Sequence, residues 1–60
     1  MTFVHANVYD NGTVYIYTKE KMNLKRFDHQ SDAIIYLQNQ GFKIAAVSDI
    51  SLWFVKEINE

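Results

Sequence analysis

The segment Asp28-His29-Gln30-Ser31 contains the three side-chain types of a hydrolytic triad, namely an acid, a base and a hydroxyl nucleophile. Working triads bring these groups together from separate segments, because neighbours along a chain rarely converge on one substrate atom. Ser31 also stands where a predicted helix begins, and a serine at that position caps free backbone N–H groups. We therefore interpret the segment as the entry to a helix and not as a catalytic centre.

The other residues that could support catalysis or bind a metal are few and scattered. His5 and His29 lie in different segments, and the chain has no cysteine, so the spacing of a zinc site is missing. Asp10 and Asp49 fall in predicted turns, where aspartate supports the backbone through side-chain hydrogen bonds. We expect no catalytic residues, no metal site and no cofactor, and we predict that the protein is not an enzyme.

A basic segment holds four of the six positive charges of the chain, on Lys19, Lys21, Lys25 and Arg26. Beside tyrosine rings, such cations could contact phosphates while the rings stack on the bases of single-stranded nucleic acid. The alternative is a solvated loop or an edge strand, in which lysines discourage pairing with other chains. The formal net charge of −1 favours this alternative over nucleic-acid binding.

Large aromatic side chains form a further group of candidate binding residues. Tyrosine and tryptophan are enriched at the energetic centres of protein interfaces. Their other common role is to pack on one another across neighbouring strands of a sheet. The candidate interface residues are Phe3, Tyr9, Tyr15, Tyr17 and Trp53.

A predicted hairpin around the turn signal Asp10-Asn11-Gly12 must position most of these rings. A two-residue loop would pair Asp10 with Thr13. A three-residue loop with a left-handed Gly12 pairs Tyr9 with Thr13 instead. We prefer the second register because it separates the side chains of the two strands by type. The strands are expected at residues 2–9 and 13–19.

The preferred register gives the hairpin two unlike faces. One face carries small side chains suited to a core: Val4, Ala6, Val8, Val14, Ile16 and Thr18. The other face carries mostly larger and more polar side chains: Phe3, His5, Asn7, Tyr9, Thr13, Tyr15, Tyr17 and Lys19. We expect the first face to pack against the rest of the protein.

The spacing of apolar residues predicts a helix over residues 33–40, with Ser31 as its N-cap. Gly41 follows at the position where a helix end commonly requires a left-handed residue. Phe42 should then contact Leu37, which is the apolar contact that accompanies a Schellman ending. The helix is short, so it needs tertiary packing to persist.

Residues 20–30 leave two interpretations open. Either the second strand continues into this segment, or the segment is a loop anchored by its apolar residues Met22, Leu24 and Phe27. The rest of the segment is polar and basic, and neither interpretation is preferred.

The last third of the chain predicts two more strands, residues 42–48 and 52–58, joined by a tight turn at Ser48-Asp49-Ile50-Ser51. Both are apolar on both faces, which suits a central or two-sided position in a sheet. The fold class is therefore α+β: a mainly antiparallel four-stranded sheet, in the order β-β-α-β-β, with one helix packed on one face. One short helix cannot cover both faces, so the aromatic face stays open and is joined by Trp53 or Phe54.

Two stretches, Gln40-Gly41-Phe42-Lys43-Ile44-Ala45-Ala46-Val47 and Leu52-Trp53-Phe54-Val55-Lys56, carry a resemblance. In this half, the chain resembles short β-β-α-β-β bacterial and phage domains of unknown function. In these domains a helix ends in glycine, an aromatic strand follows, and the last strand ends in an aromatic-aliphatic-lysine sequence. The resemblance implies a fold and carries no activity.

Length and composition bound the class of protein. Sixty residues, of which 48% are hydrophobic and 22% charged, form a single small folded domain, residues 1–60. The chain has neither an apolar run long enough to span a bilayer nor the pattern of a signal peptide, so we expect a cytoplasmic protein. Chains of this length are marginally stable alone and often gain stability from a partner chain.

These observations favour a small non-enzymatic binding protein that forms a homodimer through its aromatic face. The abundance of residues with AT-rich codons suggests a phage or mobile-element protein, which would bind and occlude a host protein. One alternative is a single-stranded nucleic-acid-binding module that uses the basic segment and the tyrosines. Another is a protein that sequesters a small ligand in a groove between two protomers.

Overall fold

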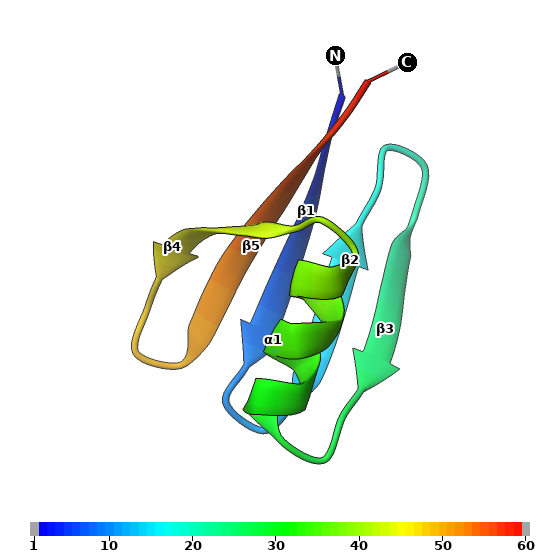
Figure 1. Ribbon diagram of the computed structural model, residues 1–60. Helices are drawn as coiled ribbons and strands as arrows, with labels where there is room; N and C mark the ends of the chain where they lie inside the picture. Colours follow the sequence, from blue (N-terminus) through cyan, green and yellow to red (C-terminus); the bar gives the residue numbers. More distant parts are fainter. Residues whose placement is uncertain (1, 60) are drawn as a thin grey trace.

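A computed structural model describes residues 2–59 as one sheet with one helix in front of it (Figure 1). The first three strands are β1 (Thr2–Tyr9), β2 (Thr13–Tyr17) and β3 (Met22–Arg26). Helix α1 (Gln30–Asn39) follows, and then strands β4 (Lys43–Val47) and β5 (Ser51–Ile58). The chain is therefore ordered β-β-β-α-β-β.

The five strands form one antiparallel sheet in the order β3-β2-β1-β5-β4. Strand β1 is central, and its eight residues pair with β2 on one side and with β5 on the other. Helix α1 lies across β1 and β2 (Figure 1). The predicted α+β class, with one helix on one face, is confirmed, but the sheet has five strands and not four.

The additional strand comes from the segment that the sequence left open. The second strand does not continue past Tyr17: the chain turns at Thr18–Lys21, where the Thr18 amide donates to the Lys21 carbonyl at 2.9 Å. Residues 22–26 then return as β3, a full strand and not a loop. All five residues of β3 are exposed, and its only apolar alternation, Met22 and Leu24, is too short to distinguish a strand from an anchored loop.

The hairpin of β1 and β2 has the three-residue loop that the sequence favours. Val8 lies opposite Val14 and Ala6 opposite Ile16, which is the register that pairs Tyr9 with Thr13. Gly12 has a φ of 88°, and its amide donates to the Tyr9 carbonyl at 3.0 Å. The left-handed conformation predicted for this glycine is therefore confirmed.

The small side chains of the hairpin form the core under the helix, as predicted. Val4, Ala6, Val8 and Val14 are buried, and Ile16 packs against them. The helix contributes its buried stripe, and the later strands contribute two phenylalanines: Ala33, Leu37, Phe42 and Phe54 complete the cluster. Phe54 therefore belongs to the core, and Trp53, its neighbour in β5, faces the other side of the sheet.

The two ends of α1 differ in how well the sequence predicts them. At the C-terminal end, the Phe42 amide donates to the Leu37 carbonyl and the Gly41 amide to the Gln38 carbonyl, both at 3.0 Å. With Gly41 at a φ of 92°, this is the predicted Schellman ending. At the N-terminal end, Ser31 is already inside the helix.

The actual N-cap is His29, which has an extended backbone (φ −136°, ψ 147°) and makes no side-chain capping hydrogen bond. Its carbonyl accepts from the amides of Asp32 and Ala33, so the helix begins earlier than a serine cap would place it. The prediction of Ser31 as the N-cap is therefore wrong. Asp32 does lie in the first turn, where its charge favours the helix N-terminus.

The last two strands take different positions in the sheet. Strand β5 lies between β1 and β4, as its apolar residues on both faces predict. Strand β4 is an edge strand with all five residues exposed, so the central or two-sided position expected for residues 42–48 is wrong. The predicted turn at Ser48–Ser51 is present, and the Ser48 amide donates to the Ser51 carbonyl at 2.9 Å. No helix in residues 2–59 has the length and apolar character needed to cross a membrane.

Candidate functional site

The face of the sheet opposite α1 carries the aromatic residues that the sequence singled out. Because side chains alternate along a strand, the strand register fixes which residues share this face. One row across the sheet consists of Leu24, Tyr15, Asn7, Trp53 and Ala46. The next row consists of Met22, Tyr17, His5, Val55 and Lys43. We call this surface, with Phe3, Tyr9 and Glu57 in the outer rows, the open face.

Ring pairs connect the strands of the open face. Tyr17 on β2 and Trp53 on β5 stack with ring centroids 5.9 Å apart and an interplanar angle of 25°. Because β1 lies between β2 and β5, this stacked pair spans the central strand. Tyr9 and Tyr15 meet edge to face, with centroids 5.6 Å apart. The cross-strand packing considered from the sequence is therefore present, and it organises the rings into one surface.

A polar side chain lies at the centre of this aromatic surface. Asn7 of β1, opposite Tyr15 on one side and Trp53 on the other, is only 2% exposed. Its amide Nδ2 donates to the Ser51 hydroxyl at 3.4 Å, which is a long hydrogen bond. Its Oδ1 atom is buried without a hydrogen-bond partner. An unsatisfied buried acceptor of this kind destabilises a fold by about 1–3 kcal/mol.

Packing among the rings leaves much apolar area of the open face in contact with water. Trp53 is 37% exposed, and Phe3, Leu24 and Met22 are each about half exposed. Leu24 and Met22 extend the face onto β3, and the sequence did not assign them to it. Their alternate spacing is the only signal that could have placed them, and it becomes informative only once β3 is known to be a strand.

Charged residues lie at the margin of the open face. A hollow of about 270 Å³ at one corner is lined by Tyr9, Asn11, Thr13, Tyr15 and Arg26. A second hollow, of about 310 Å³, is lined by Phe3, Gly41, Lys43, Val55 and Glu57. Both are shallow features of the surface. Apart from the buried Asn7, the open face therefore exposes mainly apolar side chains inside a polar margin, which is the usual arrangement of a protein interface.

The structure does not bring the four cations of the basic segment together. Successive residues of a strand point to opposite faces, so Arg26 lies on the open face while Lys25 lies on the helix side, 4.4 Å from the ring centroid of Tyr36. Lys21 lies in the β2–β3 turn. Lys19 lines a hollow with Thr2 and Val4, and so the prediction that it shares the face of the tyrosines is wrong.

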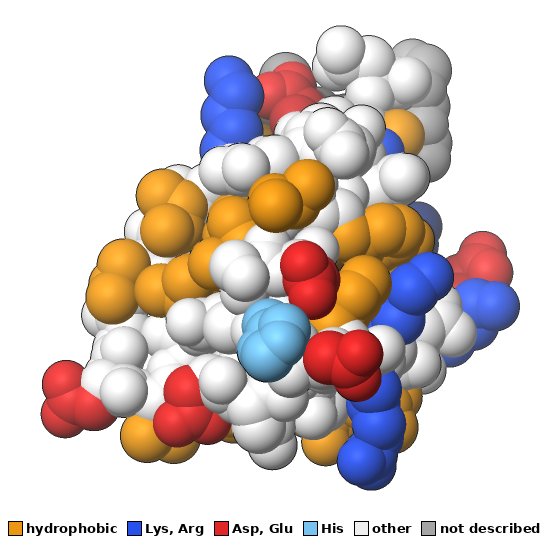
Figure 2. All heavy atoms as spheres, turned by 60° about the horizontal axis from the view of Figure 1, so that its bottom comes forward, with side chains coloured by type: hydrophobic (Ala, Val, Ile, Leu, Met, Phe, Trp, Pro, Cys, Tyr) orange, Lys and Arg blue, Asp and Glu red, His pale blue; other side chains and the backbone are white. Residues whose placement is uncertain are grey.

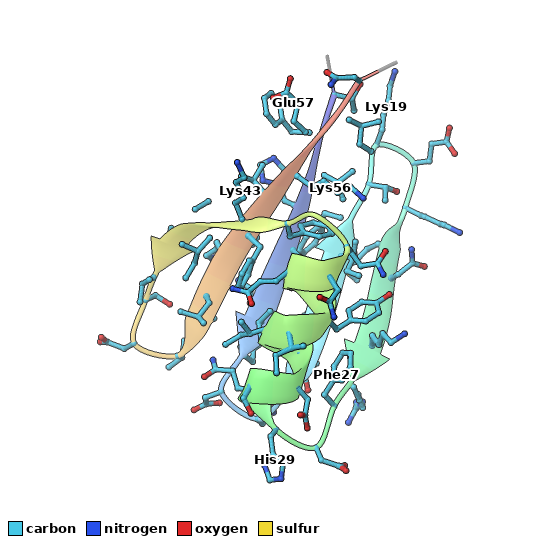
Figure 3. The ribbon with its side chains drawn as sticks, viewed as in Figure 1. Lys19, Phe27, His29, Lys43, Lys56 and Glu57 are labelled. Carbon is cyan, nitrogen blue, oxygen red and sulfur yellow. The ribbon has the colours of Figure 1, made fainter. Side chains whose placement is uncertain are left out.

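The residues considered for catalysis are likewise dispersed. His29 caps the helix at one end of the molecule (Figure 3), and Ser31 lies in the first turn of α1. His5 lies on the open face, on β1. No group of three or more histidine, cysteine or acidic side chains within residues 2–59 is placed to hold a metal ion.

Comparisons with protein-family models, with curated proteins and with solved structures find no match to this chain. The resemblance to β-β-α-β-β bacterial and phage domains stays a prediction. The functional argument therefore depends on the geometry of the open face.

Proposed function

We propose that this is a non-enzymatic binding protein that associates with a second copy of itself through the open face. The observation that carries the proposal is the exposed apolar surface around Trp53, Tyr15, Tyr17, Phe3 and Leu24 on the side of the sheet that no helix covers. Such a surface on a folded chain of sixty residues is typical of a protein that is covered by a partner.

The size of the open face is sufficient for a modest interface. The two longest dimensions of the molecule are 33 and 20 Å, so the sheet presents an area on the order of 600 Å² in projection. Stable complexes bury about 800 Å² of accessible surface per partner, and accessible surface exceeds projected area. A second copy is a suitable occupant because a two-fold contact buries the same rings on both chains.

The margin of the paired chains would then be the surface that recognises another protein. Arg26 lies beside one hollow at this margin, and Lys43 and Glu57 lie beside the other. We propose that these residues bind a second protein and cover part of its surface. The composition of the chain alone supports the further proposal that the bound protein belongs to the host of a phage or mobile element.

The single tryptophan of the chain provides a direct test of the proposal. Trp53 is 37% exposed in one chain, and association through the open face would remove its indole ring from water. Its fluorescence emission should therefore shift to shorter wavelength as the protein concentration rises from the micromolar to the millimolar range. In Tyr15→Ala with Tyr17→Ala, the emission should not change with concentration.

An emission spectrum of the unaltered chain that is independent of concentration would contradict the proposal. A short single-stranded oligonucleotide serves as the competing probe. If it changed the Trp53 emission with a steep dependence on salt, the open face would be a nucleic-acid surface and not a protein interface.

A further inference from the structure

His5 lies in the middle of the open face, on the central strand β1. The residues opposite it are Tyr17 on β2 and Val55 on β5, and both of these side chains are half-buried. His5 itself is exposed to solvent. A contact that covers the centre of the open face therefore also covers the imidazole ring of His5.

The other histidine of the chain is far from this surface. His29 is the N-cap of α1, is exposed, and lies at the lower end of the molecule in Figure 3. Figure 2, which brings that end forward, shows a histidine side chain at the surface near acidic side chains. The sequence contains two histidines, so His5 is the only one that a contact through the open face would bury.

The charged groups around His5 lie at the margin of the face. On the β5 side, Glu57 is one row further out, and Lys43 on β4 lies in the row of His5 but two strands away. These two charges have opposite signs and line the same hollow. On the β2 side the neighbour is Tyr17, a residue type that stays neutral below pH 8, and Arg26 lies at the far corner on β3. The immediate surroundings of His5 are therefore aromatic and aliphatic.

We propose that His5 makes association through the open face depend on pH, so that two chains pair when this side chain is neutral and separate when it is protonated. The inference rests on the proposed function, because it needs a second copy to cover the open face. Histidine changes its charge between about pH 5 and 8. A neutral ring packs against tyrosine and valine, whereas a protonated ring that leaves water without an acidic partner is strongly unfavourable.

The symmetry of the contact increases the effect of pH. A two-fold contact centred on the open face places the His5 rings of both chains in the same buried region. Pairing in acid then requires each ring to release its proton, so association is present above about pH 6.5 and weakens as the pH falls below it. At about pH 5.5 roughly one exposed histidine in ten is neutral, and two such rings lower the association constant about 100-fold relative to neutral pH.

Sedimentation equilibrium near neutral pH and at about pH 5.5 measures this association constant for the unaltered chain and two variants. His5→Gln keeps a polar side chain that cannot become charged, and its association constant should be nearly the same at the two pH values. Because His5 is exposed, this replacement should leave the fold intact. The matched control is His29→Gln, at a cap position whose side chain makes no capping hydrogen bond. It should keep the full pH dependence of the unaltered chain.

Chains that pair equally well at both pH values would overturn the role of His5 and leave the open-face pairing standing. Pairing that becomes stronger in acid would also overturn it, since an acidic group such as Glu57 of the second copy would then face the ring. The same conclusion follows if His5→Gln keeps the pH dependence or if His29→Gln loses it. An unaltered protein that is a single chain at both pH values would overturn the open-face proposal itself, and the role of His5 with it.

Discussion

At the scale of single residues, Asn7 occupies a position where an aliphatic side chain would stabilise the monomer better. It is buried at the centre of the open face, with one long hydrogen bond and an acceptor that has no partner. The sequence placed Asn7 on the aromatic face but gave no reason to expect it to be buried. Its burial results from the rings that stack across β1, and such long-range packing has no local signal.

Replacement of Asn7 by valine tests this account of the residue. Asn7→Val removes the unsatisfied acceptor, and we expect the free energy of unfolding to rise by about 1 kcal/mol. Urea denaturation monitored by circular dichroism measures the change. Asn23→Val on exposed β3 is the control and should change stability by less than about 0.5 kcal/mol. A clear loss of stability in Asn7→Val would contradict this account of the residue.

At the scale of elements, local signals predict the turns and long-range packing determines the rest. The loop at Gly12 and the helix end at Gly41 follow from glycines next to patterned segments, and both were predicted. The N-terminal end of α1, the exposed strand β3 and the edge position of β4 were not. Strand β3 pairs with β2 through its backbone, and Lys25 lies over Tyr36, so its side chains carry no core pattern.

The two left-handed glycines differ in what surrounds them, which gives a prediction at this scale. A Cβ at Gly41 would reach only the flexible side chain of Lys56, at 3.7 Å. Gly41→Ala should therefore destabilise the protein by about 1 kcal/mol, through backbone strain alone. A Cβ at Gly12 would overlap the carbonyl group of Phe27, whose amide donates to the Gly12 carbonyl at 2.9 Å.

Gly12→Ala should consequently destabilise the protein by about 3 kcal/mol, because steric overlap with backbone is added to the strain. Thermal and urea unfolding of both variants measure the difference between them. Equal losses of stability at the two positions would contradict the close packing of the β1–β2 loop against the segment that follows β3.

At the scale of the whole molecule, a single helix covers part of one face of a five-stranded sheet. The open face and the β4 edge are left exposed, and both carry apolar side chains. The open face could be predicted from the alternation of rings in the hairpin, although its extension onto Met22 and Leu24 could not. The β4 edge could not be predicted because its apolar residues resemble those of a central strand.

The most direct test of the central claim is the solution mass of the unaltered chain and of Tyr15→Ala with Tyr17→Ala, at low and at high salt. An apolar contact is insensitive to salt, whereas contacts between exposed charges are screened. Ile35→Ala, on the exposed side of α1, is the control and should leave the mass unchanged. Our account predicts that the two tyrosine substitutions halve the mass at both salt concentrations. A mass that these substitutions leave unchanged, or an unaltered protein that is a single chain, would contradict it.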